Sequence, residues 1–290
     1  MYTVIIAVVI VVSAMYLRPL MEYQRIPRIT IGSTINHLVM YRTSSSRIVN
    51  LKMYKNCYQR WLELNPGLTI EWFNNRDCLR FMKTQGEILL RTYQTLRPGA
   101  FKADLFRLCI LYERGGVYAD SNTLPYVSLR EMMKGMEFPP CHRFVSVLDC
   151  KRSKEGIHNG FIAVSARHPF LRAAIRRIID NVKRRSYEDH NLAITGPICL
   201  SRAINNFLGR DENKVMTVGF NECGEYSFHL LRFGWGYNPC QYVYRRDNTA
   251  VLSKKHCLLS LLMDKFKATA YSRMVRNREV YNELDLIPAG

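Results

Sequence analysis

The stretch 98–122 constrains the fold more than any other part of the chain. A Pro-Gly pair opens a predicted helix that runs to about Tyr112, and a double glycine at 115–116 ends it, because glycine accepts left-handed backbone geometry. A short strand, 117–119, follows, and the sequence Asp-Ser-Asn at 120–122 lies where that strand ends. Ligands of open α/β sheets bind beyond the carboxyl ends of strands, so this stretch predicts a binding site at that edge.

Four polar side chains of this stretch suit an anionic or sugar ligand. Asp104 and Arg107 are three residues apart on the predicted helix, so they share a face and can meet Asp120 and Asn122 around one cleft. A carboxylate at a strand end suits Mg²⁺ or Mn²⁺, which also bind phosphate oxygens, whereas Asn122 offers only a neutral carbonyl oxygen. Arg107 can hold phosphate or sugar oxygens, and Asp104 can accept from sugar hydroxyls. The alternative is an ordinary helix ion pair followed by a common turn sequence.

Strand and helix signals alternate along the body of the chain. A helix is predicted over 52–64, where Asn-Pro-Gly ends it, and a strand follows over 68–73. Two further helices are predicted over 170–185 and 200–208, and the aromatic-rich stretch 224–248 has no clear assignment. This alternation favours an α/β fold with a mostly parallel central sheet.

The net charge and the cysteines exclude some classes of protein. The chain of 290 residues carries 42 Lys and Arg against 24 Asp and Glu, a net charge of +18, which favours polyanionic partners. The basic residues are spread and accompany no nucleic-acid-binding motif, so nucleic acid is not an expected partner and a nucleic-acid-binding protein is the least favoured alternative. The nine cysteines include no Cys-x-x-Cys pair, which argues against a structural zinc site.

The first residues form a nearly unbroken apolar run at 3–17. A membrane-spanning helix needs about 20 apolar residues, so the run is short but usable as an anchor helix within residues 1–21. A cleaved signal peptide is the alternative, since Val-Ser-Ala at 12–14 resembles a cleavage site, although no basic residue precedes the run. We therefore expect a single-pass membrane protein of the endomembrane system (Golgi or ER type), with its orientation left open.

The run from Pro98 to Asp120 resembles the sugar-binding core of glycosyltransferase family 32, whose pattern is close to A-x-x-S-D-x-x-R-Y-x-x-L-x-x-x-G-G-x-Y-x-D-x-D. The clostridial glucosylating toxins have a similar core. The resemblance extends from about residue 26 to residue 200 through shorter matches in the same order. These are Ile26-Pro27-Arg28-Ile29, Trp61, Leu64-Asn65-Pro66-Gly67, Trp72, Asn159, Phe161, His168-Pro169 and Thr195-Gly196-Pro197.

The resemblance implies a GT-A-like nucleotide-sugar-binding fold and a metal-assisted, retaining hexosyltransferase. The donor would be a UDP- or GDP-sugar, the acceptor a glycan or glycolipid, the cofactor Mn²⁺ or Mg²⁺, and the membrane a partner through the N-terminal segment. The implied catalytic residues are Asp104, Arg107 and Asp120, the donor-binding residues Tyr41, Tyr118 and Asn159, and the metal ligands Asp120 and Asn122.

Two departures from the family pattern leave an alternative open. Asn122 replaces the second carboxylate, which weakens the expected metal dependence and favours a catalytically inactive relative that acts as a binding protein. The family's late His…Gly-Ser-Trp segment has only a loose counterpart in His229 and Gly234-Trp235.

The expected domains are an anchor at 1–21, a glycosyltransferase domain at 22–260 and a basic helical extension at 261–290.

Overall fold

The computed structural model describes eight stretches of the chain, all within the unit Thr34–Gly290. The expected anchor at 1–21 and the first residues of the glycosyltransferase domain expected at 22–260 lie outside them. The described residues are 37–41, 51–136, 143–149, 156–223, 226–235, 241–244, 247–254 and 270–283.

The described strands form one mixed sheet with the order β2-β1-β3-β6-β5-β8-β9-β10-β4, and β7 pairs with β8. The predicted parallel pairing is found where β1 joins β2 and β3, and again between β5 and β8, while the other pairs are antiparallel. The strands are β1 His37–Tyr41, β2 Thr69–Phe73, β3 Gly116–Asp120, β4 Thr123–Pro125, β5 Phe144–Asp149, β6 Gly156–Val164, β7 Gly219–Cys223, β8 Tyr226–Trp235, β9 Gln241–Tyr244 and β10 Ala250–Lys254.

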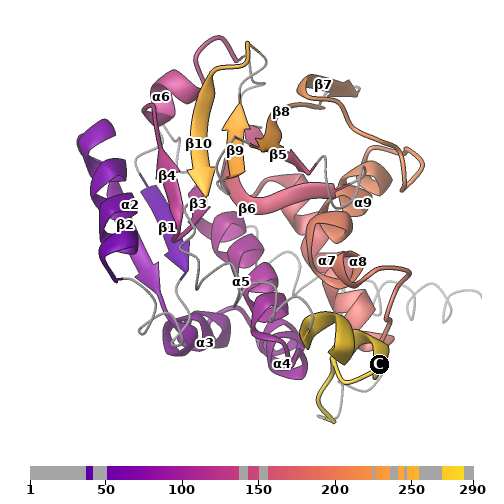
Figure 1. Ribbon diagram of the computed structural model, residues 1–290. Helices are drawn as coiled ribbons and strands as arrows, with labels where there is room; N and C mark the ends of the chain where they lie inside the picture. The colour runs from indigo at the N-terminus through magenta and orange to yellow at the C-terminus, as the bar shows by residue number, and fades with distance from the viewer. Residues whose placement is uncertain are drawn as a thin grey trace, which may run out of the picture. The chain divides into compact units, whose positions relative to one another are not determined.

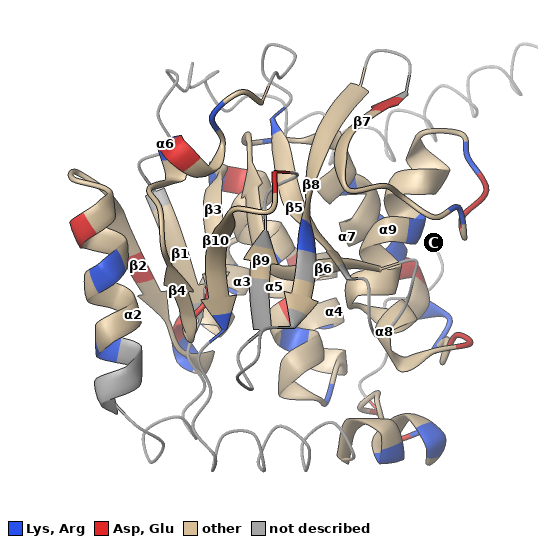
Figure 2. Cartoon of the chain, turned by 45° about the horizontal axis from the view of Figure 1, so that its top comes forward, with Lys and Arg blue, Asp and Glu red and all other residues tan. Residues whose placement is uncertain are grey.

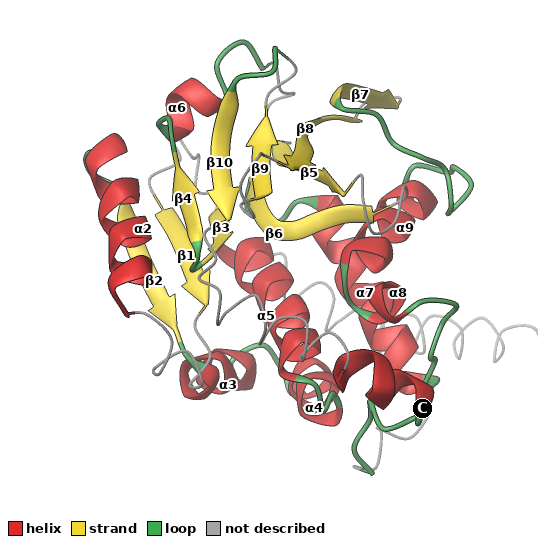
Figure 3. Cartoon of the chain, in the orientation of Figure 1, coloured by secondary structure: helices red, strands yellow, loops and turns green. Residues whose placement is uncertain are grey.

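Helices cover both faces of this sheet (Figures 1 and 3). Helices α3, α4, α5, α7 and α9 supply one hydrophobic cluster, and α2 and α6 supply the other. Each sheet face receives alternate residues, as the two-residue period of a strand requires. In β3, Tyr118 packs into the first cluster, whereas Val117 and Ala119 pack into the second. The helices are α2 Leu51–Leu64, α3 Asn75–Lys83, α4 Glu87–Thr95, α5 Gly99–Arg114, α6 Leu129–Met132, α7 Pro169–Lys183, α8 Asn191–Ile194 and α9 Pro197–Phe207.

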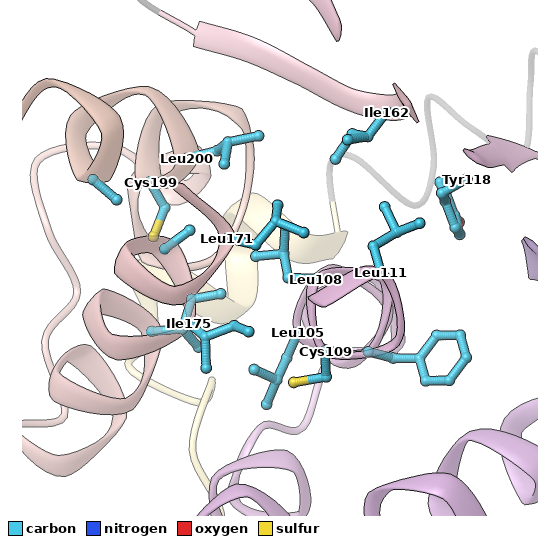
Figure 4. Packing of buried hydrophobic residues seen from close by; sticks show 14 of the residues in the cluster. Leu105, Leu108, Cys109, Leu111, Tyr118, Ile162, Leu171, Ile175, Cys199 and Leu200 are labelled. Carbon is cyan, nitrogen blue, oxygen red and sulfur yellow. The ribbon is translucent and has the colours of Figure 1, made fainter. Parts of the chain in front are cut away.

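Helix α5 is the central element of the first cluster. It packs against both β3 and α7, and Figure 4 shows Leu108 of α5 pointing toward Leu171 of α7. Because neighbours cover it on more than one side, every residue from Ala103 to Leu111 is buried, including the two charged ones. Gly115 ends the helix with φ 67°, and a Cβ there would lie 2.6 Å from the backbone nitrogen of Ala166. The double glycine thus serves both the turn and a close backbone approach.

The element predictions of the N-terminal half agree with the structure. Helix α2 and strand β2 occupy the stretches predicted at 52–64 and 68–73, and α5, Gly115 and β3 follow in the predicted order. The unassigned stretch 224–248 contains β8 and β9, and residues 270–276 of the predicted C-terminal extension are helical. Lys and Arg lie on several elements, α2 and the 270–276 helix among them (Figure 2).

The prediction of a single-pass membrane protein is corrected. Across the described ranges, no helix combines the length and the apolar character that crossing a bilayer demands. The longest of these helices, α5, has 16 residues and therefore spans only about 24 Å, and it contains charged side chains. The apolar run at 3–17, on which the prediction rested, is not among the described residues.

Candidate functional site

The polar residues selected from the sequence meet at the carboxyl end of β3. Asp120 is the last residue of that strand, and the parallel neighbour β1 places the backbone of Tyr41 opposite it. On the other side, β6 runs antiparallel to β3 and brings Asn159 to the same edge. Asp104 and Arg107 reach this edge from α5, which packs against the sheet. One helix and three adjacent strands therefore bring these polar residues together.

Asp104 forms the buried side of the site. Only 9% of the residue is exposed, and both carboxylate oxygens accept hydrogen bonds. Oδ1 accepts from Nδ2 of Asn159 at 2.9 Å, and Oδ2 accepts from the hydroxyl of Thr195 at 2.9 Å. Burial raises the pKa of Asp104 to about 6, although the Arg107 guanidinium and these two hydrogen bonds act in the opposite direction. The carboxyl group is thus held in place inside the protein.

Arg107 connects the buried side of the site to its open side. Its Nη1 donates to the backbone carbonyl of Asn159 at 2.6 Å and lies 3.6 Å from Oδ1 of Asp120, while Nη2 lies 3.4 Å from Oδ1 of Asp104. The guanidinium also stacks over the ring of Tyr118, 4.5 Å from its centroid. A guanidinium suits this position because its planar set of donors serves several acceptors at once.

Asp120 is the more accessible carboxylate, with 27% of its side chain exposed. Oδ2 accepts a hydrogen bond from the Lys254 ammonium at 2.7 Å, and Oδ1 accepts one from the Tyr118 hydroxyl at 3.2 Å. Burial alone would raise the pKa of Asp120, but the positive charges of Lys254 and Arg107, with His158, outweigh it and hold the pKa well below the usual range. Asp120 is therefore ionised at neutral pH.

Gly160 permits the close packing around Asp120. A Cβ at this position would lie 2.6 Å from Oδ2 of Asp120 and 2.4 Å from Cε1 of His158. Both distances are shorter than any normal contact, so a side chain at Gly160 would push against both groups. The imidazole of His158 is held here as well, because its Nδ1 accepts from the backbone N–H of Gly160.

Most of the residues expected at the site do come together. Asp104, Arg107, Tyr118, Asp120 and Asn159 form one connected set of contacts. Asn122 follows two residues after Asp120 and is partly buried. The strand position of Tyr41 is described, whereas its side chain is outside the described part. His229 lies in β8, where its ring packs against Phe220.

The sequence reasoning missed Lys254 and Thr195 as site residues. Lys254 is one of many spread basic residues in the sequence, and Thr195 was named only within the match Thr195-Gly196-Pro197. The antiparallel pairing of β10 with β4 sets Lys254 opposite Thr123, just beyond the end of β3. The turn after α8 brings Thr195 to Asp104, and a Cβ on the adjacent Gly196 would lie 3.6 Å from Oδ2 of Asp104.

A divalent cation does not fit these residues as they lie. A metal at about 2.1 Å from Oδ2 of Asp120 would be within about 5 Å of the Lys254 ammonium, a repulsion of roughly 7 kcal/mol at an effective dielectric constant of about 20. Within the described ranges, no group of three or more His, Cys, Asp or Glu residues is placed to hold a metal. A divalent cation at Asp120 would first have to displace Lys254. The Mn²⁺ or Mg²⁺ site expected at Asp120 and Asn122 therefore remains a prediction from the sequence.

Residues 52–139 match the family model described as "Glycosyltransferase sugar-binding region containing DXD motif". The matched region extends from α2 to just beyond α6 and contains Asp104, Arg107, Asp120 and Asn122. The match confirms the expectation of a glycosyltransferase with a sugar-binding region of this kind. The narrower assignment to family 32 stays a prediction. No curated protein sequence matches the chain.

Several solved glycosyltransferase structures have a similar course of the chain. The PaToxG glycosyltransferase is 15% identical with a TM-score of 0.47, and the match covers 60% of this chain and 70% of that one. GlyE of Streptococcus pneumoniae TIGR4 is 13% identical with a TM-score of 0.38, covering 60% of this chain and 43% of GlyE. Mouse xyloside xylosyltransferase 1 is 9% identical with a TM-score of 0.40, covering 67% and 84%. At these TM-scores no role of a residue is carried over from them.

Proposed function

We propose that the chain transfers a hexose from a UDP- or GDP-sugar to a hydroxyl group of a glycan or glycolipid acceptor. The observation that carries the proposal is the connected set of Asp104, Arg107 and Asp120 at the carboxyl end of β3, inside the matched sugar-binding region. A strand end in an α/β sheet is where such folds bind ligands. A GT-A-like fold, membership of family 32 and retention of anomeric configuration are parts of the proposal that rest on the sequence resemblance.

The charges of the site suit the leaving group of such a reaction. In the transfer, the bond between the anomeric carbon and the diphosphate oxygen breaks, and the acceptor hydroxyl oxygen bonds to that carbon. The hydroxyl proton passes to the departing nucleoside diphosphate. Negative charge therefore builds on the diphosphate, and fixed cations beside it lower the barrier. Arg107 and Lys254 converge on Asp120 from different elements and supply positive charge at that point.

The two carboxylates have different tasks in this proposal. Asp104 is buried and accepts hydrogen bonds from Asn159 and Thr195, so it is a fixed part of the proposed sugar site and keeps Arg107 in place. Asp120 is more exposed and faces the donor. Tyr118, stacked under the guanidinium, fixes the distance between Arg107 and Asp120. The roles expected for Tyr41 and Asn122 remain proposals carried over from the resemblance.

The proposal is tested with the purified full chain and a panel of UDP- and GDP-sugars. Release of nucleoside diphosphate is measured with glycan and glycolipid acceptors, and donor binding is measured by calorimetry. We expect one donor to be turned over, and Arg107→Met to lower the rate by about 10²-fold or more, since it removes a charge that stabilises the transition state. Glu63→Gln, which alters an exposed ion pair on α2, is the control and should not change the rate. Failure of every donor to bind would overturn the proposal.

A second candidate function is a sugar-nucleotide-binding protein without turnover. Asn122, in place of the second carboxylate of the family pattern, favours it. Donor binding in calorimetry, together with no nucleotide release for any acceptor or metal condition, would select this candidate.

A further inference from the structure

Lys254 lies beside Asp120, where the proposed transfer reaction builds negative charge on the donor diphosphate. Its ammonium lies 2.7 Å from Oδ2 of Asp120, and the two side chains are 18% and 27% exposed. The pair therefore lies at the accessible side of the site, unlike Asp104 and Arg107, whose side chains are 12% and 9% exposed. Of these four side chains, Lys254 and Asp120 are therefore the more accessible to a ligand at the carboxyl end of β3.

The backbone holds Lys254 in this position. β10 pairs antiparallel with β4 in a register that sets Lys254 opposite Thr123, and Ser253 of the same strand is fully buried. The hydroxyl of Tyr126 donates to that of Ser253 at 2.9 Å, which further ties β10 to the chain after β4. The ammonium is thus delivered by a sheet strand, which is more rigid than a loop.

We propose that Lys254 supplies, beside the donor diphosphate, the positive charge that a divalent cation would otherwise supply, so that nucleotide binding and transfer need no added metal. This inference rests on the proposed function. An ammonium has three N–H donors, and the bond to Asp120 uses one of them. The others suit phosphate oxygens, for which lysine is a common partner. Asp120 acts in this arrangement as the positioning residue that orients the ammonium.

The replacement of the second carboxylate is consistent with this role. An ammonium bound to Asp120 needs only that one anionic partner, whereas a divalent cation at the same point is held better by two carboxylates. Asn122 keeps the oxygen but not the charge. The site thus contains Asp120, which holds Lys254. The second carboxylate that a metal would require is replaced by the neutral Asn122.

The experiment measures binding of UDP and GDP to the full chain by titration calorimetry, once in EDTA and once with Mn²⁺. We expect the native chain to bind one nucleotide with the same Kd, within about 2-fold, in both conditions. Lys254→Met should weaken binding in EDTA by about 10- to 100-fold, the value of one charge-assisted hydrogen bond. Lys254→Arg keeps the charge and should bind within a few-fold of the native chain. Lys134→Met removes a lysine from an exposed ion pair with Glu131 and is the matched control, with no change expected.

The possible outcomes separate the role of Lys254 from the proposed function. Binding of the native chain only with Mn²⁺ would overturn the role of Lys254 and leave the proposed function intact, and this comparison depends on no variant. Undiminished binding by a folded Lys254→Met chain in EDTA would do the same. If the native chain binds neither nucleotide in either condition, the proposed function fails together with the inference. Circular dichroism of each variant separates a loss of binding from a loss of folding.

Discussion

The raised pKa of Asp104 leads to a pH-dependence of stability that Asp104→Asn should remove. Burial raises the pKa of this carboxyl to about 6, whereas an aspartate in an unfolded chain titrates near about 3.9. Because the folded chain holds the proton more tightly, this group stabilises the fold fully below about pH 4. That contribution is lost as the pH rises to about 6 and beyond. Asparagine has no proton to lose, so the variant lacks this component.

The size of the effect follows from the two pKa values, which differ by about 2 and therefore correspond to roughly 3 kcal/mol of unfolding free energy. We expect the unfolding free energy of Asp104→Asn, relative to that of the native chain, to rise by roughly 2–3 kcal/mol between about pH 4 and pH 7. Urea unfolding followed by tryptophan fluorescence at several pH values in this range measures the difference directly. At low pH, the remaining difference in unfolding free energy between the two chains measures the hydrogen bonds that Asp104 accepts from Asn159 and Thr195. The amide of the asparagine variant has one oxygen in place of two and keeps only one of these bonds as an acceptor.

The control is Asp189→Asn, for which the sign reverses. Asp189 is exposed, and its hydrogen bond and ion pair with Arg202 lower its pKa. This carboxylate stabilises the fold above its unfolded pKa of about 3.9. Asp189→Asn should therefore become less stable relative to the native chain as the pH rises to about 5, and the difference should change little from there to about pH 7. A difference between Asp104→Asn and the native chain that stays constant from about pH 4 to pH 7 would refute the reasoning. Asp104 would then titrate at its ordinary value, and burial would not dominate its environment.

Three further predictions concern packing and charge at the site. Gly160→Ala pushes against Asp120 and should weaken nucleotide binding by about 10-fold or more in calorimetry, since the added Cβ would lie 2.6 Å from Oδ2; an unchanged Kd would contradict the packing described. Asn122→Asp combined with Lys254→Met creates two carboxylates without the ammonium, so nucleotide binding should become dependent on Mn²⁺. Equal nucleotide binding by the double variant in Mn²⁺ and in EDTA would contradict the idea that lysine and metal can replace each other. Trp61→Phe removes the hydrogen bond from a fully buried indole to a β4 carbonyl and should cost about 1–3 kcal/mol, seen as a melting temperature lower by at least about 2 °C; an unchanged melting temperature would refute it.

The elements around the site were predictable because their signals are local. The helix that begins after Pro98, its end at Gly115 and the acidic end of β3 each depend on residues within a few positions of one another. Strand β8 was not assigned, since residues 227–231 are buried in succession and show no two-residue period. The membrane prediction was wrong on the finding for the described helices, none of which could span a bilayer.

The site was predictable only in part. Asp104, Arg107 and Asp120 could be grouped from the sequence because a helix and the strand that follows it bring them together. Their degree of exposure could not, since it depends on how α7, α8 and β6 cover α5. The structure buries Asp104 and Arg107 and leaves 27% of the Asp120 side chain exposed.

By itself, the sequence determined the order helix, double glycine, strand and acidic end, because backbone preferences of neighbouring residues decide these features. It also determined the class of chemistry, through residue types that suit phosphate and sugar. Only the tertiary structure decided which cation lies at Asp120. Lys254 is 134 residues away along the chain and has no local feature that separates it from other surface lysines. The pairing of β10 with β4 brings its ammonium to the carboxylate, and such pairing depends on the whole sheet.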